Sequence, residues 1–362
     1  MARNHWLTLG LTALLAIGAG ALVQAAPALA TDELAKIITE AKAPARFADH
    51  KANFSFGKET FSFKNGAEKT EFYTIKDGDK YIAVLHPGMI QLDMITFDPT
   101  KGVDKPGFKD YYSWGTLLGT RITVNCWAGG MGPTGKVSFD FKTTGSTLTL
   151  TTQQVWAGTK GVCDYVMTLS CDPVLGYVWN ATTAYASDKP PTKVVKDKQG
   201  NESTKLETIE FFNWQVPVTA WTSRNNNPRW PAGWTHARKV FFRPDNKIVG
   251  FWLNPDSVDY CKYKRSDVKE GGFVAKLPGP DGWGVGLVHV QKAPYSTNNA
   301  TCNMWADSHN LLKLPDQPDA DGVYRAKAVW RFQAIPPEGV QAIMKVAEMD
   351  NIGKDKYCKD AP

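Results

Sequence analysis

The sequence predicts an all-β protein, a large antiparallel β-sandwich with a short helix near each end. From about residue 53 to residue 335 apolar and polar residues alternate, which is the period of a half-buried strand. Glycine, proline, asparagine and aspartate separate the successive runs, as they do at turns. Helical spacing occurs only outside this region, so strands do not alternate with helices and a parallel α/β sheet is not expected.

The first helix is predicted over residues 31–43. Leu34, Ile37 and Ile38 share one helical face, and Pro44 ends the pattern. A second helix is predicted over residues 337–349, because a proline followed by an acidic residue is typical of a first helical turn.

Three hairpins are predicted from paired strand-like runs around turn residues. They comprise residues 72–75 and 81–85 around 76–79, residues 137–141 and 148–150 around 144–146, and residues 239–242 and 248–252 around 244–246. A last long strand is expected over residues 323–335. Residues 187–205, with adjacent prolines and several lysines, predict a long exposed loop inserted into the strand pattern.

The first thirty residues have the pattern of a signal peptide. A short polar start precedes an apolar run from Leu7 to Val23, and Ala28-Leu29-Ala30 is a small-x-small cleavage signal. A single membrane anchor is the alternative, since the run approaches spanning length. We therefore expect an exported protein, periplasmic or extracellular, with no stable membrane insertion after cleavage.

These patterns divide the chain into four parts. Residues 1–30 form the signal peptide, 31–52 an N-terminal helical segment, 53–336 the β-sandwich domain, and 337–362 a C-terminal helix and tail.

Charge and cysteine content narrow the partners. Only Arg3 is formally charged within residues 1–30, so cleavage lowers the net charge from +6 to +5. This mild excess favours an acidic glycan or simply supports solubility. No nucleic-acid motif is present, and export argues against such a partner. The six cysteines of an exported chain predict disulfides, although sequence alone does not choose among their pairings.

Histidine and arginine two residues apart give the first candidate site. His236 and Arg238 would lie on one face of a strand. On an acidic glycan, Arg238 would neutralise a uronate carboxylate, and His236 or Tyr260 would remove the neighbouring proton. Lys262 and Arg265 would attract the polyanion. A basic strand edge is the structural alternative.

Two further strands carry candidate residues. Asp307 and His309 are two apart, so the carboxylate could orient the imidazole, and Trp305 would extend the same face with a ring that can stack on a sugar. His289 lies in the apparent strand over residues 285–291 and would border a cleft or be buried as a structural histidine.

Exposed tryptophans are the remaining candidates. Trp230 and Trp234 lie among proline, glycine and asparagine residues, so a loop is expected there, and flat aromatic faces beside amide groups are typical of sugar sites. The chain has no P-loop, nucleophile elbow or zinc-protease motif, and no cysteine pair has zinc-finger spacing. Neither a cofactor nor a metal site is predicted.

The order of strands between residues 120 and 337 resembles that of galactose mutarotase-like supersandwich proteins, which include aldose epimerases and the β-domains of polysaccharide lyases. The likeness is carried by the strand 165–173, which ends in Asp172-Pro173 and is followed at once by Gly176-Tyr177-Val178, and by residues 302–310 before the last strand. The resemblance implies a sugar substrate and, in epimerases, a histidine working with a carboxylate. No specific epimerase histidine or glutamate aligns with this chain.

The sequence thus predicts an exported carbohydrate-active protein, a polysaccharide lyase or a sugar epimerase-like enzyme that acts on an acidic glycan. The alternative is a non-catalytic glycan-binding or cell-envelope β-sandwich protein.

Overall fold

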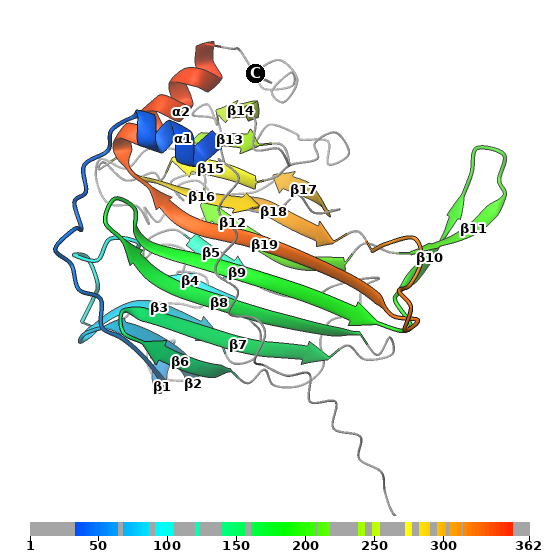
Figure 1. Cartoon of the computed structure of the whole chain (residues 1–362), viewed down its shortest axis with the longest axis horizontal. Coiled ribbons are helices and arrows are strands. Elements are labelled where there is room, and N and C mark those ends of the chain that lie inside the picture. The colour runs from blue at the N-terminus through cyan, green and yellow to red at the C-terminus, as the bar shows by residue number, and fades with distance from the viewer. Residues whose placement is uncertain are drawn as a thin grey trace, which may run out of the picture.

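The computed structural model describes residues 33–63, 68–86, 91–104, 120–123, 139–155, 161–206, 209–217, 238–242, 248–253, 272–276, 282–289, 295–301, 305–312 and 314–349. In this part of the chain two large antiparallel sheets lie face to face, and two short helices flank one end (Figure 1). The predicted all-β antiparallel sandwich is therefore confirmed.

The eight-stranded sheet runs in the order β1-β2-β3-β4-β5-β12-β18-β17. Its strands are β1 (Phe54–Phe63), β2 (Glu68–Asp77), β3 (Lys80–His86), β4 (Gln91–Met94), β5 (Thr120–Thr123), β12 (Ile209–Pro217), β18 (Trp305–Leu312) and β17 (Tyr295–Thr301).

The nine-stranded sheet runs in the order β14-β13-β15-β16-β19-β9-β8-β7-β6. Its strands are β14 (Ile248–Leu253), β13 (Arg238–Phe242), β15 (Gly272–Lys276), β16 (Gly284–His289), β19 (Tyr324–Ile335), β9 (Gly176–Ser187), β8 (Val162–Asp172), β7 (Thr147–Val155) and β6 (Asp140–Thr144).

The predicted hairpins are present as β2–β3, β6–β7 and β13–β14. Gly78 and Gly145 take the positive φ angles that the first two turns need, 56° and 57°. The predicted long loop after residue 187 is instead a hairpin of β10 (Thr192–Lys196) and β11 (Glu202–Leu206), which projects from the body in Figure 1. The Asp197 side chain accepts hydrogen bonds from the backbone of Gln199 and Asn201, and this closes its turn.

The core lies between the two sheets. In β8 and β9 every second residue is buried there, as the period of two requires, and Tyr165, Tyr177 and Trp179 are among the largest fully buried side chains. Trp179 of the nine-stranded sheet donates its indole N–H to the sulfur of Met94 in the eight-stranded sheet, at 3.0 Å. The same core thus spans both sheets.

The helices α1 (Glu33–Glu40) and α2 (Pro337–Met349) pack on each other and on the end of β19. Leu34, Ile37 and Ile38 form the predicted apolar stripe, which contacts Ile335 and the apolar face of α2. Among the described residues no helix is both long and apolar enough to cross a membrane. The predicted signal peptide lies outside the described residues.

The structure tests the predicted disulfides only in part. Cys171 carries a free thiol, so a pairing that uses all six cysteines does not form. The disulfides themselves stay a prediction.

Candidate functional site

Residues 41–53, which we call the strap, run from α1 to the start of β1 and contact both sheets. The strap backbone is bonded to the β8–β9 turn, where Phe47 N donates to Pro173 O at 2.9 Å. Arg46 pairs with Glu338 of α2 and lies over the ring of Trp283, 5.8 Å from its centroid. These contacts fix the strap against the end of the sandwich.

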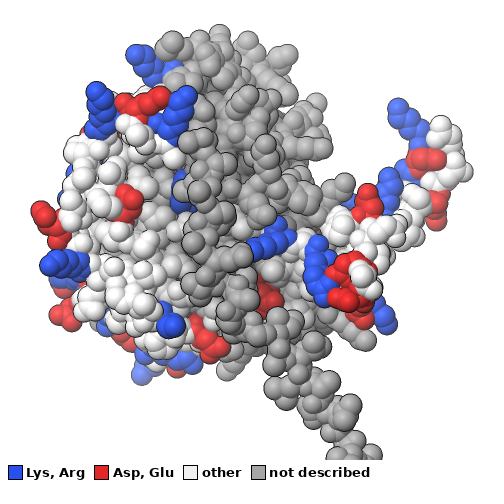
Figure 2. Space-filling view, viewed as in Figure 1, with Lys and Arg blue, Asp and Glu red and all other residues white. Residues whose placement is uncertain are grey.

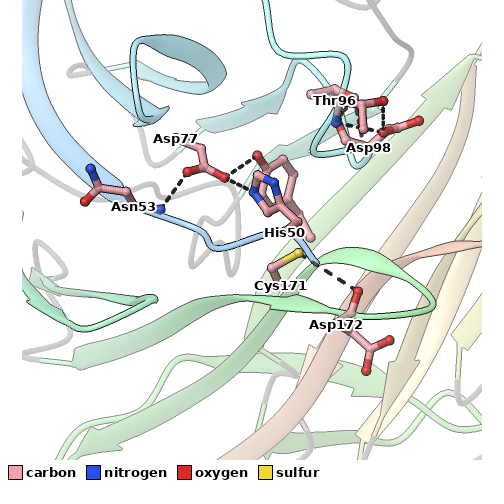
Figure 3. A network of polar contacts seen from close by, with 9 residues as sticks. His50, Asn53, Asp77, Thr96, Asp98, Cys171 and Asp172 are labelled. Atoms are coloured by element: carbon pink, nitrogen blue, oxygen red, sulfur yellow. Dashed lines mark hydrogen bonds and ion pairs between the residues drawn. The ribbon is translucent and has the colours of Figure 1, made fainter. Parts of the chain in front are cut away.

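Asp77 is the centre of a polar network between the strap and both sheets (Figure 3). Its Oδ2 lies 2.6 Å from His50 Nε2 and accepts the hydroxyl of Tyr177 at 2.8 Å, while its Oδ1 accepts the backbone N–H of Asn53 at 2.7 Å. The Asp77 side chain is only 6% exposed, whereas that of His50 is 27% exposed. A buried carboxylate therefore holds a histidine that solvent can reach.

The position of Asp77 follows from the β2–β3 turn. Asp77 is the last residue of β2 and pairs with Phe54, the first residue of β1. Gly78 then turns the chain and donates its N–H to Asn53 O at 2.9 Å. The turn therefore fixes the Asp77 carboxylate beside the strap.

The position of Tyr177 follows from the β8–β9 turn. Asp172 Oδ1 accepts the N–H groups of Val174 and Leu175, and Gly176 follows at φ 76°. A Cβ on Gly176 would lie 2.2 Å from Phe97 O, so only glycine fits here. Tyr177 N donates to the same carbonyl at 2.8 Å, which holds the ring opposite Asp77.

Burial keeps the Tyr177 hydroxyl and the Cys171 thiol, which lie beside Asp77, neutral. Burial, together with the hydrogen bond to Asp77, raises the pKa of Tyr177 well above its ordinary range. Burial and the nearby Asp77 and Asp172 carboxylates raise the pKa of the Cys171 thiol to about 11. Neither group is a nucleophile or base near neutral pH, so His50 is the group of this network suited to moving a proton.

The arrangement resembles what a general base requires. A carboxylate can only accept hydrogen bonds, so the imidazole presents Nε2–H to Asp77 and leaves Nδ1 as its second nitrogen. Asp77 is itself held by Tyr177 and by the backbone of Asn53, which fixes its orientation. A base oriented by a third group in this way is the usual arrangement in acid–base catalysis.

A second polar cluster lies on the opposite face of the eight-stranded sheet. Burial opposes ionisation of Glu59, but hydrogen bonds from Lys76 and Tyr81 outweigh it and lower the pKa of Glu59. Lys76 also lies 4.1 Å from the centroid of the Tyr81 ring. Because these groups satisfy one another, the cluster is best explained as structural.

Most of the predicted site residues lie outside the described residues. This holds for His236, Tyr260, Trp230, Trp234, Lys262 and Arg265. Their proposed roles stay predictions.

Four others have a described backbone. Arg238 begins β13 opposite Lys276 of β15, and His289 ends β16 opposite Trp330, both in the nine-stranded sheet. Trp305 and His309 belong to β18 of the eight-stranded sheet, where His309 pairs with Asn213. The strand expected around His309 is thus present, but the backbones of the predicted residues are divided between two sheets.

The sequence interpretation missed His50, Asp77 and Tyr177 as a group. Asp77 stood out only as a turn residue and Tyr177 only as the start of a strand. Among the described residues no group of three or more histidine, cysteine, aspartate or glutamate side chains could hold a metal ion.

Comparisons with known proteins give fold likenesses at low similarity. No protein-family model matches the chain, and no curated protein sequence matches it. An α-N-acetylgalactosaminidase, NagBb from Bifidobacterium bifidum in complex with GalNAc, aligns at 7% identity and a TM-score of 0.38, over 76% of this chain and 38% of that one. The chain therefore spans well under half of that enzyme.

Two further solved structures align with the chain. A candidate aldose 1-epimerase from Escherichia coli K12 aligns at 9% identity and a TM-score of 0.29, over 77% of this chain and 99% of that one. A β-arabinopyranosidase aligns at 11% identity and a TM-score of 0.26, over 80% of this chain and 39% of that one. These structures are sugar-processing enzymes by name, but all TM-scores lie below 0.5, so the supersandwich resemblance stays a prediction.

Proposed function

We propose that this protein is an exported carbohydrate-active enzyme in which His50 and Asp77 transfer a proton to or from a sugar. The observation that carries the proposal is the 2.6 Å contact between His50 Nε2 and Asp77 Oδ2, with the carboxylate buried and the imidazole partly exposed. The predicted signal peptide and the tryptophan-rich loops support an exported protein that meets glycans.

The proposed reaction is a lyase or epimerase-like step on an acidic glycan. In a lyase, a base removes the proton on the carbon next to the uronate carboxylate. The electron pair of that C–H bond forms a C=C bond as the glycosidic C–O bond breaks, and the leaving oxygen takes a proton from water. His50 Nδ1 would be the base, and Asp77 would stabilise the imidazolium that forms.

The alternative function is a non-catalytic glycan-binding protein. One observation favours it, because the His50–Asp77–Tyr177 bonds also join the strap to both sheets, a role that needs no substrate. In that case His50 would hold the strap against the two sheets and would not act as a base.

The experiment is a screen of residues 31–362 on uronate-containing and neutral glycans, with ultraviolet absorbance detecting unsaturated uronate products and polarimetry detecting epimerisation. His50→Gln retains an N–H donor for Asp77 but cannot carry a proton. The proposal expects a product from the wild-type protein and a strongly reduced rate of product formation from this variant at equal folded fraction. Asp77→Asn removes the carboxylate that orients His50 and is also expected to abolish product formation. Asp79→Asn, at an exposed turn position two residues from Asp77, is its control.

Binding without turnover would instead support the alternative. Export is tested separately by determining the N-terminus of secreted protein, which is expected near residue 31. A retained residue 1 in secreted or periplasmic protein would contradict the predicted cleavage.

A further inference from the structure

The hairpin of β10 and β11, residues 192–206, projects from the body of the sandwich, and we call it the arm. Figure 1 shows it standing clear of both large sheets, and Figure 2 shows lysine side chains along it with acidic side chains between them. All of its residues are exposed except Val195 and Leu206, which are partly buried. An isolated two-stranded hairpin is only marginally stable. Most side chains of the arm therefore meet solvent or a binding partner rather than the protein core.

Two lysines lie directly opposite each other on the arm. Lys193 of β10 pairs with Lys205 of β11. The side chains of such a pair leave the same face of the hairpin, with Cβ atoms about 4.5–5.5 Å apart, so the two ammonium groups repel each other. Both side chains are exposed, and in the described part of the chain neither forms an ion pair. Like charges placed directly opposite destabilise a hairpin, and an anion bound to both lysines would offset that cost.

The acidic side chains of the arm do not neutralise this lysine pair. Glu202 lies on the other face, where it forms an ion pair with Lys196 across the hairpin at 3.0 Å. Asp197 lies at the turn, where its Oδ1 accepts the N–H groups of Gln199 and Asn201. Its Oδ2 accepts the side-chain amide of Asn201 at 2.9 Å. One face of the arm therefore has balanced charge, while the other presents two lysines with no carboxylate between them.

We propose that Lys193 and Lys205 form a binding site for the carboxylates of an acidic glycan, separate from the His50–Asp77 site. A lysine ammonium has three donors and no acceptor, so it suits a carboxylate. A polyuronate repeats a carboxylate on each sugar, so two lysines can bind two carboxylates of one chain, and the second contact forms at a high effective concentration. This site deepens the proposed carbohydrate function and rests on it for the class of ligand.

The arm lies far from the His50–Asp77 site along β9. Tyr177, which donates to Asp77, is the second residue of that strand, and the arm follows its last residue, Ser187. At the usual rise of an extended strand, the stretch from Tyr177 to Ser187 spans about 33 Å. Only a long glycan chain could therefore reach both sites, so the arm would retain a polymer beside the sandwich.

A glycan fits the lysine face better than an anionic membrane does. Membrane-binding segments combine several basic residues with large apolar side chains that enter the lipid. The next pair along the lysine face is Val195 and Ser203, and Ser203 donates its hydroxyl to Val195 O at 3.3 Å. Val194, the large exposed apolar side chain of the arm, lies on the other face. The lysine face thus offers charge without an apolar anchor.

The test is isothermal titration of residues 31–362 with uronate hexasaccharides (galacturonate, mannuronate and guluronate series) and with their methyl esters, which keep the sugars and lose the charge. Lys193→Gln and Lys205→Gln each remove one charge of the pair. Lys196→Gln is the matched control, because it removes one charge from the opposite face of the same hairpin. Each pair variant is expected to weaken uronate binding about two- to fivefold, and the double variant about tenfold, as for exposed charges. The control is expected to bind as the wild type does.

Lys205→Glu separates a lost site from a damaged hairpin. A glutamate opposite Lys193 forms an opposite-charge pair that favours the hairpin, yet its carboxylate repels the ligand. Uronate binding should therefore fall further than in Lys205→Gln, while amide hydrogen exchange of residues 192–206 becomes slower than in the wild type. A variant that only damages the hairpin would show faster exchange instead.

The site is overturned if the wild-type protein binds uronates no better than their methyl esters, or if the pair variants bind as the Lys196→Gln control does. Lysine-dependent binding to phosphatidylserine vesicles but not to uronates also overturns it. If uronate binding depends on the lysine pair while no glycan is turned over, the enzyme proposal fails and the site stands. If a uronate polymer is turned over with the same KM in the pair variants, the site fails and the proposed function stands.

Discussion

The hydroxyl of Tyr177 in the nine-stranded sheet donates to the carboxylate of Asp77 in the eight-stranded sheet, at 2.8 Å. This bond crosses between the two layers of the sandwich, and His50 of the strap joins it from a third segment. One buried carboxylate therefore ties together three parts of the chain that are distant in sequence (Figure 3).

Replacing Tyr177 by phenylalanine removes this bond but keeps the ring, whose centroid lies 5.8 Å from that of the Phe54 ring. Because the bond has a charged acceptor and is well buried, we expect the free energy of unfolding to fall by about 1.5–3 kcal/mol. Urea denaturation followed by tryptophan fluorescence measures the change. An unchanged midpoint and slope would show that the hydroxyl does not link the sheets.

Replacing Gly176 by alanine should be more damaging than replacing another positive-φ glycine. At Gly176 the new Cβ would meet Phe97 O at 2.2 Å, whereas at Gly145 it would meet nothing within 4 Å. Gly145→Ala carries only the left-handed backbone cost, about 1–2 kcal/mol. We expect Gly176→Ala to lose clearly more stability in the same thermal or urea titration. Equal losses would mean that the turn can move away from residue 97.

The thiol of Cys171 should react slowly at ordinary pH. With a pKa of about 11, raised by burial and by Asp77 and Asp172, it holds only ~0.1% thiolate at pH 8. Alkylation of the peptide that contains Cys171, followed by mass spectrometry, should accelerate as pH rises toward 11.

The Asp77→Asn variant provides the matched comparison for Cys171. It removes one of the charges that raise the thiol pKa, so alkylation at pH 8 should become faster than in the Asp79→Asn control. Equal rates in the two variants would contradict the electrostatic coupling.

The Arg46–Glu338 pair should contribute stability only above the acid range. The hydrogen bond from Arg46 outweighs partial burial and lowers the pKa of Glu338 in the folded state. A carboxyl whose folded pKa is lowered contributes its full stability above its unfolded pKa, and this contribution is lost as pH falls through the folded pKa.

The Glu338→Gln variant tests whether the stability contributed by Glu338 is lost as pH falls. Its melting temperature should lie below that of the wild type at pH 7, and the difference should shrink below about pH 4. Glu40→Gln, which breaks the exposed pair with Lys36, is the control and should change little. A melting-temperature difference between Glu338→Gln and the wild type that grows toward low pH would contradict a lowered pKa of Glu338.

Local patterns predicted the elements well. The alternation of β8, β9 and β19 showed the strands, Asp77-Gly78 showed the β2–β3 turn, and Pro337-Glu338 showed the start of α2, because each signal depends on neighbouring residues. The segment after residue 187 was misinterpreted as a loop. Its lysines and prolines outweighed the short β-branched runs that pair as β10 and β11.

The network around Asp77 could not be predicted from such local signals. His50, Asp77 and Tyr177 come from three segments, and the distance between them is set by sheet packing and by the strap rather than by spacing in the sequence. A lone histidine before a strand and an aspartate at a turn are each ordinary.

The most direct test of the central claim is the turnover rate of His50→Gln relative to wild type on the glycan that the wild-type protein converts. Loss of general base catalysis should lower kcat by about 10²–10⁴-fold while the melting temperature stays close to that of the wild type. A variant that is stable and equally active would contradict the account, and the role of His50 would then be only to hold the strap against the sheets.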